Sequence, residues 1–174
     1  MNSKISVLLI VFFFLASSSM AQEKSKKELK EEKKLALQKD VDDLVNSKEF
    51  IYMAATAFPS GMRSVNLSVN SYYVKYHPNH IESYMPFYGR VYSAAPYTGD
   101  GGLKFEGEPS EFKVEKGKKN YSVTANVKSG AENYTLNLIV NFDGSAALSI
   151  ISNNRNTISY NGHIYPYPTP TELK

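Results

Sequence analysis

Residues 121–127 read YSVTANV and residues 134–140 read YTLNLIV, and this pair of segments decides the fold class. In both, apolar side chains alternate with mainly serine, threonine or asparagine. Because successive side chains of a β-strand point to opposite faces, this alternation predicts strands with one buried and one hydrated face. Gly130 lies in the turn between them, so the two segments are expected to form an antiparallel hairpin.

The same period extends outward from this hairpin. Residues 50–58 form a compact β-capable run that Pro59 ends. Further on, Asp143-Gly144 and Asn161-Gly162 have the residue pairs that two-residue hairpins prefer. We therefore expect a mostly β (α+β) protein, built as a single curved antiparallel sheet or barrel-like meander with an N-terminal helix.

The helix is predicted before the strands, in a charged segment. Lysine and glutamate alternate there at helical spacing, and Leu37, Val41, Leu44 and Val45 form an apolar stripe in its second half. A tether or coiled-coil arm is the alternative, but the stripe is short for a coiled coil. The expected organisation is a signal peptide (1–21), a charged helical lead-in (22–48), an antiparallel β domain (49–165) and a proline-rich tail (166–174).

The first residues have the pattern of an export signal. Lys4 supplies a positive start, an apolar run covers Ile5 to Leu15, and small residues precede a cleavage point at Ala21-Gln22. Retention of this segment as an anchor is the alternative. No other run is long enough to span a membrane, so we expect a periplasmic or secreted protein. The chain has no cysteine, which excludes a lipidated cysteine and disulfides, so a hydrophobic core must hold the domain.

Composition and motifs argue against several functional classes. Net charge is only +3 and the charges are interspersed, whereas nucleic-acid binding usually needs a one-signed basic patch. No cysteine nucleophile, Gly-x-Ser-x-Gly elbow or phosphate-binding loop is present, so we expect neither an enzyme nor a cofactor. His77, His80 and Glu82 are metal-ligand types, but Pro78 prevents a regular helix there, and a polar turn is the favoured interpretation. Asp100 is interpreted as a turn former in the glycine-rich loop.

Residues 84–92, YMPFYGRVY, concentrate aromatic residues at the middle of the chain. They predict a bent, rigid crossing whose rings are buried against strands from both halves, with Gly89 at positive φ where the chain turns. This is either core architecture or a recognition surface. Arg90 and Arg155 could bind a carboxylate or phosphate if both face one cavity, or could pair structurally with backbone carbonyls or with an acid such as Glu82. The candidate ligand-binding residues are Tyr84, Phe87, Tyr88, Arg90, Tyr92 and Arg155; no catalytic or metal site is predicted.

The order of these motifs resembles the domain-of-unknown-function 4251 family. The resemblance rests on the alanine-rich strand before Pro59, on residues 84–92 with Ala95-Pro96 behind them, on residues 102–105, and on residues 154–162. It runs from about Phe50 to Ile164. Members are exported Bacteroidetes proteins, many of them lipoproteins, and this chain departs in having no lipidation cysteine. The resemblance implies an envelope location and one β-rich domain, and it implies no reaction.

Two functional hypotheses remain open. The first is binding of a small apolar or amphiphilic ligand through the aromatic segment and the glycine loop at residues 98–102. The second is an envelope protein–protein interaction or structural module, in which the charged helix and the proline tail make the contacts. A pocket of roughly 300 Å³ or more lined by Tyr84, Phe87 and Tyr92 would support the first hypothesis, and a filled core the second.

Overall fold

The computed structural model describes residues 26–92 and 101–167. The expected signal peptide, Ala95-Pro96, Asp100 and the prolines after Tyr167 lie outside these residues. The elements are α2 (Lys26–Ser47), β1 (Phe50–Pro59), β2 (Val65–Asn66), β3 (Tyr73–His77), β4 (His80–Met85), β5 (Leu103–Gly107), β6 (Pro109–Lys116), β7 (Asn120–Ser129), β8 (Glu132–Asn141), β9 (Ser145–Ser152) and β10 (Arg155–Pro166).

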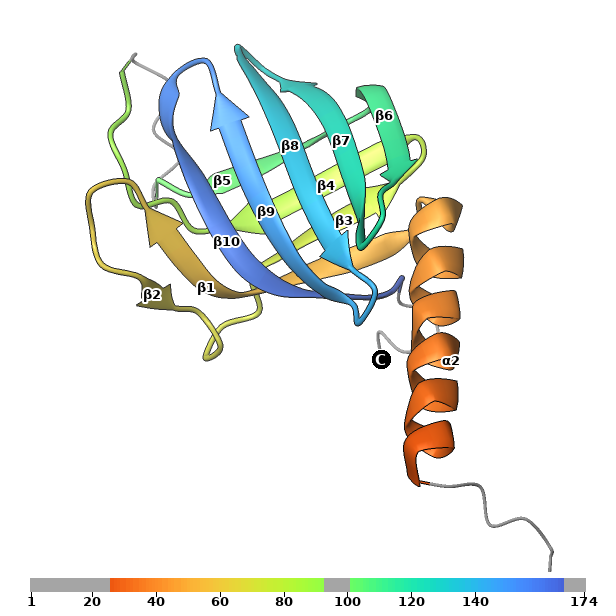
Figure 1. Cartoon of the computed structure of the whole chain (residues 1–174). Coiled ribbons are helices and arrows are strands. Elements are labelled where there is room, and N and C mark those ends of the chain that lie inside the picture. The colour runs from red at the N-terminus through yellow and green to blue at the C-terminus, as the bar shows by residue number, and fades with distance from the viewer. Residues whose placement is uncertain (1–25, 93–100, 168–174) are drawn as a thin grey trace, which may run out of the picture. The chain divides into compact units, whose positions relative to one another are not determined.

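The strands form one antiparallel ten-stranded sheet in the order β5-β4-β3-β1-β10-β9-β8-β7-β6, with β2 beside β1. The sheet curls until its two end strands approach each other, as Figure 1 shows. Glu108 alone joins β5 to β6, and a Cβ on Gly107 would lie 3.0 Å from the carbonyl oxygen of Lys128 in β7. The expected curved antiparallel sheet with an N-terminal helix is confirmed, as a nearly closed barrel-like form.

Side chains from the inner face of the sheet fill its interior. The alternation seen in the sequence matches burial, since every second residue of β7 and β8 is buried. Four tyrosines are fully buried, and Phe105 stacks on Tyr134 with ring centroids 3.9 Å apart. The largest fully buried side chains are Tyr52, Tyr76, Tyr121, Tyr160, Phe50, Leu67, Ile81, Met85, Leu103, Leu136, Leu138 and Leu148.

The second half of α2 packs with the sheet as one compact unit, which begins at Ala36, whereas residues 26–35 belong to a separate unit. Val41 and Val45 are buried, as the apolar stripe predicts. Asp42 accepts hydrogen bonds from the Tyr121 hydroxyl (2.6 Å) and from Lys116 Nζ (2.9 Å), which fixes the helix to β6 and β7.

Most predicted turns are present, but one is wrong. Gly130 and Gly144 adopt positive φ in the turns that flank β8. Asn161-Gly162, by contrast, lies inside the continuous strand β10 rather than in a hairpin. A Cβ on Gly162 would lie 2.0 Å from the carbonyl oxygen of Met53, so this glycine permits close approach of β1.

The prediction of a positive φ at Gly89 is also wrong, because its backbone lies outside that region. A Cβ at this position would lie 2.7 Å from the end of the Phe87 ring. The glycine is therefore needed for space beside an aromatic ring and not for a left-handed turn.

Candidate functional site

The aromatic segment begins with the last two residues of β4 and then lies against β10, through the hydrogen bond from Tyr160 to Pro86 and the bridge between Val91 and Arg155. Phe87 and Tyr88 are half-buried and pack on the core. Tyr84 and Tyr92 are 39% and 68% exposed, which corrects the expectation that all these rings are buried. On the outer face of the sheet, Tyr84 stacks on Tyr72 and Tyr73, with both centroid separations at 5.9 Å.

A small hollow lies within this aromatic segment. It measures about 190 Å³, below the roughly 300 Å³ typical of small-molecule sites. Three of the six candidate residues, Tyr84, Phe87 and Tyr88, are brought together there, whereas Arg90, Tyr92 and Arg155 are not among its lining residues. The lining is Tyr72, Tyr84, Met85, Pro86, Phe87, Tyr88, Gly102 and Lys104. Ligand binding by these residues stays a prediction.

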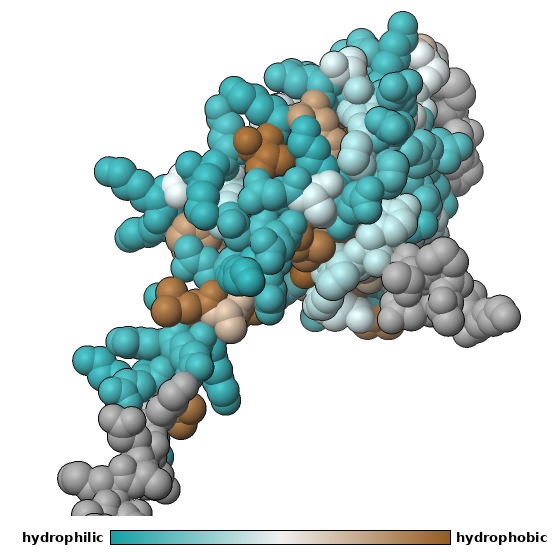
Figure 2. All heavy atoms as spheres, turned by 90° about the vertical axis from the view of Figure 1, so that its right-hand side faces the viewer, coloured by the Kyte–Doolittle hydropathy of each residue, from teal (hydrophilic) through white to brown (hydrophobic). Residues whose placement is uncertain are grey.

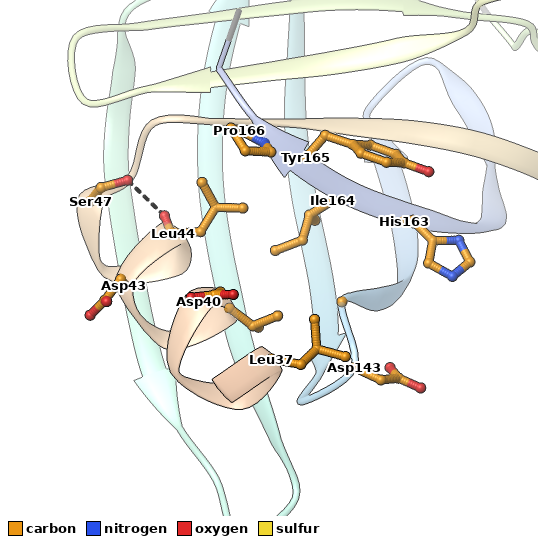
Figure 3. Close-up of a pocket in the computed structure, with 12 residues that line it drawn as sticks. Leu37, Asp40, Asp43, Leu44, Ser47, Asp143, His163, Ile164, Tyr165 and Pro166 are labelled. Atoms are coloured by element: carbon orange, nitrogen blue, oxygen red, sulfur yellow. Dashed lines mark hydrogen bonds between the residues drawn. The ribbon is translucent and has the colours of Figure 1, made fainter. Parts of the chain in front are cut away.

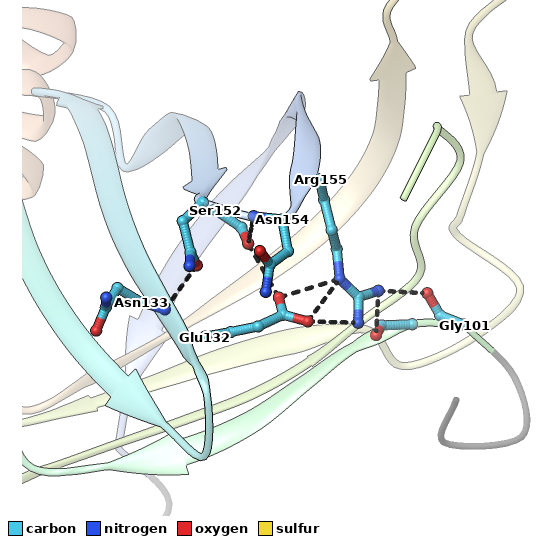
Figure 4. Close-up of polar contacts among 8 residues, drawn as sticks. Gly101, Glu132, Asn133, Ser152, Asn154 and Arg155 are labelled. Atoms are coloured by element: carbon cyan, nitrogen blue, oxygen red, sulfur yellow. Dashed lines mark hydrogen bonds and ion pairs between the residues drawn. The ribbon is translucent and has the colours of Figure 1, made fainter. Parts of the chain in front are cut away.

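Arg155 is instead the centre of a buried polar network, drawn in Figure 4. Its Nε and Nη2 donate to the Glu132 carboxylate at 3.2 Å each, and the two side chains are only 8% and 7% exposed. Nη1 donates to the carbonyl oxygens of Gly101 and Gly102 at 3.0 and 3.3 Å. The guanidinium lies 5.4 Å from the centre of the Phe87 ring. Arg155 thus joins β8, β10 and the start of β5.

Burial alone would raise the pKa of Glu132, but hydrogen bonds from Arg155, Tyr134 and Ser152 outweigh it and hold that pKa below its usual value. The carboxylate is therefore ionised at neutral pH and matched by the guanidinium. Of the alternatives for Arg155, structural pairing to an acid and to backbone carbonyls is the one observed. The acid is Glu132 and not Glu82.

Arg90 precedes Val91, which forms an isolated antiparallel bridge with Arg155, but its side chain has a different environment. Its carbonyl accepts from the backbone N–H of Asn156 at 3.1 Å, and the neighbouring N–H of Tyr92 donates to the carbonyl of Asn154 at 2.8 Å. Arg90 itself is exposed. The two segments therefore pair through their backbones, while the side-chain donors of Arg155 are used within the protein.

The histidines of the β3–β4 turn pair with different carboxylates. His77 Nε2 lies 3.4 Å from Glu49, and His80 Nε2 lies 3.6 Å from Glu106. Glu82 accepts from the Tyr73 hydroxyl at 2.5 Å and from Lys75 Nζ at 2.8 Å. Among residues 26–92 and 101–167, no three metal-ligand side chains come together.

A larger groove lies between the second half of α2 and the end of β10, in a place that the sequence did not indicate. Its volume is about 680 Å³. Figure 3 shows Leu37 and Leu44 of the helix and Ile164 of the strand directed into the space between the two elements. The lining residues are Leu37, Asp40, Val41, Asp43, Leu44, Ser47, Asp143, Gly144, His163, Ile164, Tyr165 and Pro166.

The groove combines an apolar floor with an acidic rim. Leu37 and Tyr165 are 44% and 51% exposed, so apolar surface stays in contact with water. Figure 2 views the molecule from the side on which α2 lies in Figure 1, and it shows separate hydrophobic patches in a mainly hydrophilic surface. Asp43 lies at one side of the groove, and Asp143 lies with His163 at the other (Figure 3).

Asp143 also holds the turn between β8 and β9. Its Oδ1 accepts from the Ser145 hydroxyl at 2.6 Å and from the Ser145 backbone N–H at 3.0 Å. These two bonds, with a smaller contribution from His163, lower the pKa of the carboxyl below its usual value. The groove wall at this hairpin is fixed further, because the Ile164 N–H donates to the Gly144 carbonyl at 3.0 Å.

Comparison with known families gives a direct match. The model of the family described as Domain of unknown function (DUF4251) matches residues 32–164. The chain belongs to the DUF4251 family. The match begins inside α2 and includes both the helix side and the strand side of the groove.

The fold of this DUF4251 protein also resembles a solved structure. The crystal structure of a DUF4251 family protein from Bacteroides eggerthii is 18% identical, with a TM-score of 0.59, and the match covers 75% of this chain and 88% of that one. This likeness shows the fold alone. Comparison with curated proteins gives no match. In the described part of the chain, no helix has the length and apolar character needed to cross a membrane.

Sequence reasoning missed the groove in this DUF4251 protein, although one signal pointed to it. The stripe at Leu37, Val41 and Leu44 predicted docking of the helix, and three aspartates interleave with it. Which strand faces the stripe depends on the order of the strands in the sheet. The sequence does not show that β10, the last strand, pairs with β1, the first. The stripe therefore identified one wall of the groove but not the other.

Proposed function

We propose that this DUF4251 protein is an exported, non-catalytic binding protein that holds a small amphiphilic ligand in the groove between α2 and β10. The single observation that carries the proposal is the 680 Å³ groove with its apolar floor. Small-molecule sites typically measure roughly 300–1,000 Å³ and have apolar linings with a few polar groups. The groove has this size and this composition.

The exposed leucine on the floor supports the proposal energetically. Leu37 is 44% exposed, and the neighbouring Leu44 is half-buried. Fully burying a leucine side chain is worth roughly 1.5–3 kcal/mol relative to exposure. An apolar ligand that covers both leucines would therefore gain about 1–2 kcal/mol from them, so the rest of a micromolar binding free energy, about 8 kcal/mol, must come from the other lining residues.

The export part of the proposal rests on the sequence. A lysine, an apolar run and small residues before Gln22 follow the order of a secretory signal. The absence of cysteine agrees with a domain that relies on its packed core in an oxidising compartment. The intact mass of the protein purified from its own envelope fraction tests export, since cleavage would give a chain that begins at Gln22.

Native mass spectrometry of the same preparation tests binding. A non-covalent adduct that leaves on collisional activation supports a carried ligand. A titration with an environment-sensitive apolar dye then measures affinity for wild type and for two variants. Leu37→Gln removes apolar surface from the groove, and Leu35→Gln is the matched control, because Leu35 is 66% exposed on the same helix and does not line the groove.

We expect Leu37→Gln to weaken dye binding about threefold to tenfold, from the loss of roughly half a leucine side chain of contact. Leu35→Gln is expected to bind like wild type. Equal affinities for wild type and Leu37→Gln would overturn the assignment to the groove. A chain that binds neither the dye nor any envelope ligand would overturn the function itself.

A second candidate function is an envelope protein–protein interaction module. It is favoured by exposed apolar side chains after β1, where Met62 and Val69 are 62% and 91% exposed. Exposed apolar surface marks interaction sites in some proteins. Crosslinking in cells through a photoreactive residue at position 69 tests it, and recovery of one defined partner would favour this function over ligand binding.

A further inference from the structure

We infer that the groove selects amphiphiles with a cationic head group, an inference that rests on the proposed function. The argument comes from the distribution of charge around the apolar floor. The chain as a whole has 20 lysines and arginines against 17 acidic residues. The groove lining reverses this balance, since it contains Asp40, Asp43 and Asp143 and neither lysine nor arginine.

The positions of the carboxylates favour a charged head at the mouth rather than deep in the groove. Asp40, Asp43 and Asp143 are all exposed, whereas Val41 and Ile164 beneath them are buried. An amphiphile with its tail along Leu44 and Ile164 would thus place its head among the carboxylates. A cation there gains attraction from the carboxylates nearest to it, and an anion meets repulsion from the same groups.

Two of the nearby lysines are engaged elsewhere in the unit that contains the groove, and Lys39, exposed beside Asp40, does not line the groove. Lys116 bonds to Asp42, which turns toward β6 and β7 and does not line the groove. Lys48 donates to the carbonyl of Phe112 at 2.8 Å and lies over the Phe112 ring. His163 is the one basic side chain of the lining. Asp143 stays fixed in place by Ser145, so its carboxylate is preorganised.

The size of the selectivity follows from the exposure of the carboxylates. Exposed carboxylates on the groove rim, in high dielectric and at moderate salt, favour a cation over a neutral head by about threefold to tenfold. An anionic head of the same tail is disfavoured by a similar factor. Because the carboxylates are exposed, raising the salt to about 1 M shortens the screening length to about 3 Å and reduces both factors.

Titration with three probes that share one tail tests the inference: dodecyltrimethylammonium, dodecyl maltoside and laurate, each below its micellar concentration. We expect affinity to fall in that order. The variant Asp40→Asn/Asp43→Asn is expected to reduce the preference for the ammonium probe about threefold to tenfold. The control Glu31→Gln/Glu108→Gln makes the same change in net charge outside the lining and should preserve the preference.

The outcomes separate the inference from the proposed function. Equal affinity for the three probes, with binding still weakened by Leu37→Gln, overturns head-group selection and leaves the groove as the site. Preference for laurate overturns it as well. Loss of the preference in the control variant shows a general charge effect and also refutes it. No binding of any probe refutes the proposed function together with this inference.

Discussion

Replacing Arg155 by methionine should destabilise the fold strongly at neutral pH. The methionine keeps an unbranched side chain beside Phe87 but leaves the Glu132 carboxylate without its cation. Glu132 and Arg155 are 7% and 8% exposed at the side chain, so solvent offers little compensation. Breaking a buried pair by removing one partner typically costs about 3–5 kcal/mol.

The lower end of that range applies here, because Ser152 still donates to Glu132 at 2.9 Å. A cost of about 3 kcal/mol in the free energy of unfolding corresponds to a drop in Tm of about 12 °C for a domain of this size. Circular dichroism during thermal and urea unfolding measures both quantities. The double variant Arg155→Met/Glu132→Gln removes both charges, so we expect it to be more stable than Arg155→Met alone by at least about 1 kcal/mol.

The pH dependence provides the sharper test. In the wild type the pKa of Glu132 is lowered from its usual value of 4.5, so the pair stabilises the fold above that pH and loses its effect as pH falls through the lowered pKa. In Arg155→Met only the hydrogen bonds from Tyr134 and Ser152 oppose burial, so the folded-state pKa of Glu132 rises relative to the wild type and the variant is penalised most at neutral pH. The stability difference should therefore shrink on acidification to about pH 4.

Two results would refute this reasoning. One is a loss below about 1 kcal/mol at pH 7, which would mean that the pair contributes no more than an exposed ion pair. The other is a stability difference that widens toward pH 4. Either result would also reopen Arg155 as a ligand-binding residue, since a guanidinium not needed for stability is available for other roles.

Three further substitutions test close contacts by urea denaturation. Gly162→Ala should cost about 3 kcal/mol or more, because the added methyl would lie 2.0 Å from the Met53 carbonyl oxygen and β1 must move. Gly89→Ala should cost less than about 1.5 kcal/mol, because the ring of Phe87 can shift where backbone cannot; a cost equal to that of Gly162→Ala would contradict this role. Tyr160→Phe should cost about 1–2 kcal/mol, because its hydroxyl donates to the Pro86 carbonyl at 2.6 Å, and an unchanged midpoint would show that water replaces the bond.

The sheet could be predicted because its information is local. Strict alternation in β7 and β8 specifies which side chains are buried, and turn residues such as Gly130 and Gly144 specify where each strand reverses. The same reasoning failed at Asn161-Gly162, because a hairpin dipeptide and a glycine required by close strand approach look alike in sequence. Only the pairing of Gly162 with Ala54 of β1 distinguishes them.

The partners of charged side chains were less predictable, because strand register decides them. Glu82 lies directly opposite Lys75 in the β3–β4 hairpin and accepts a hydrogen bond from it. The acid left for Arg155 is Glu132, 23 residues before it in the chain and at the start of β8. Ser152, one residue before the β9–β10 turn, also bonds to this acid. No spacing rule in the sequence connects these three residues.

The attachment of α2 explains how a groove and a stable helix coexist. Val41 and Val45 are buried in the core, and Asp42 accepts hydrogen bonds from β6 and β7. These contacts attach the helix to the sheet. Leu37 and Leu44 belong to the same stripe, line the groove toward β10, and are not fully covered. If the apolar stripe served only to anchor the helix, a shift toward β10 would bury more of both leucines. The bonds of Asp42 oppose that shift, so part of the stripe stays exposed beside β10, where the proposed ligand would cover it without detaching the helix.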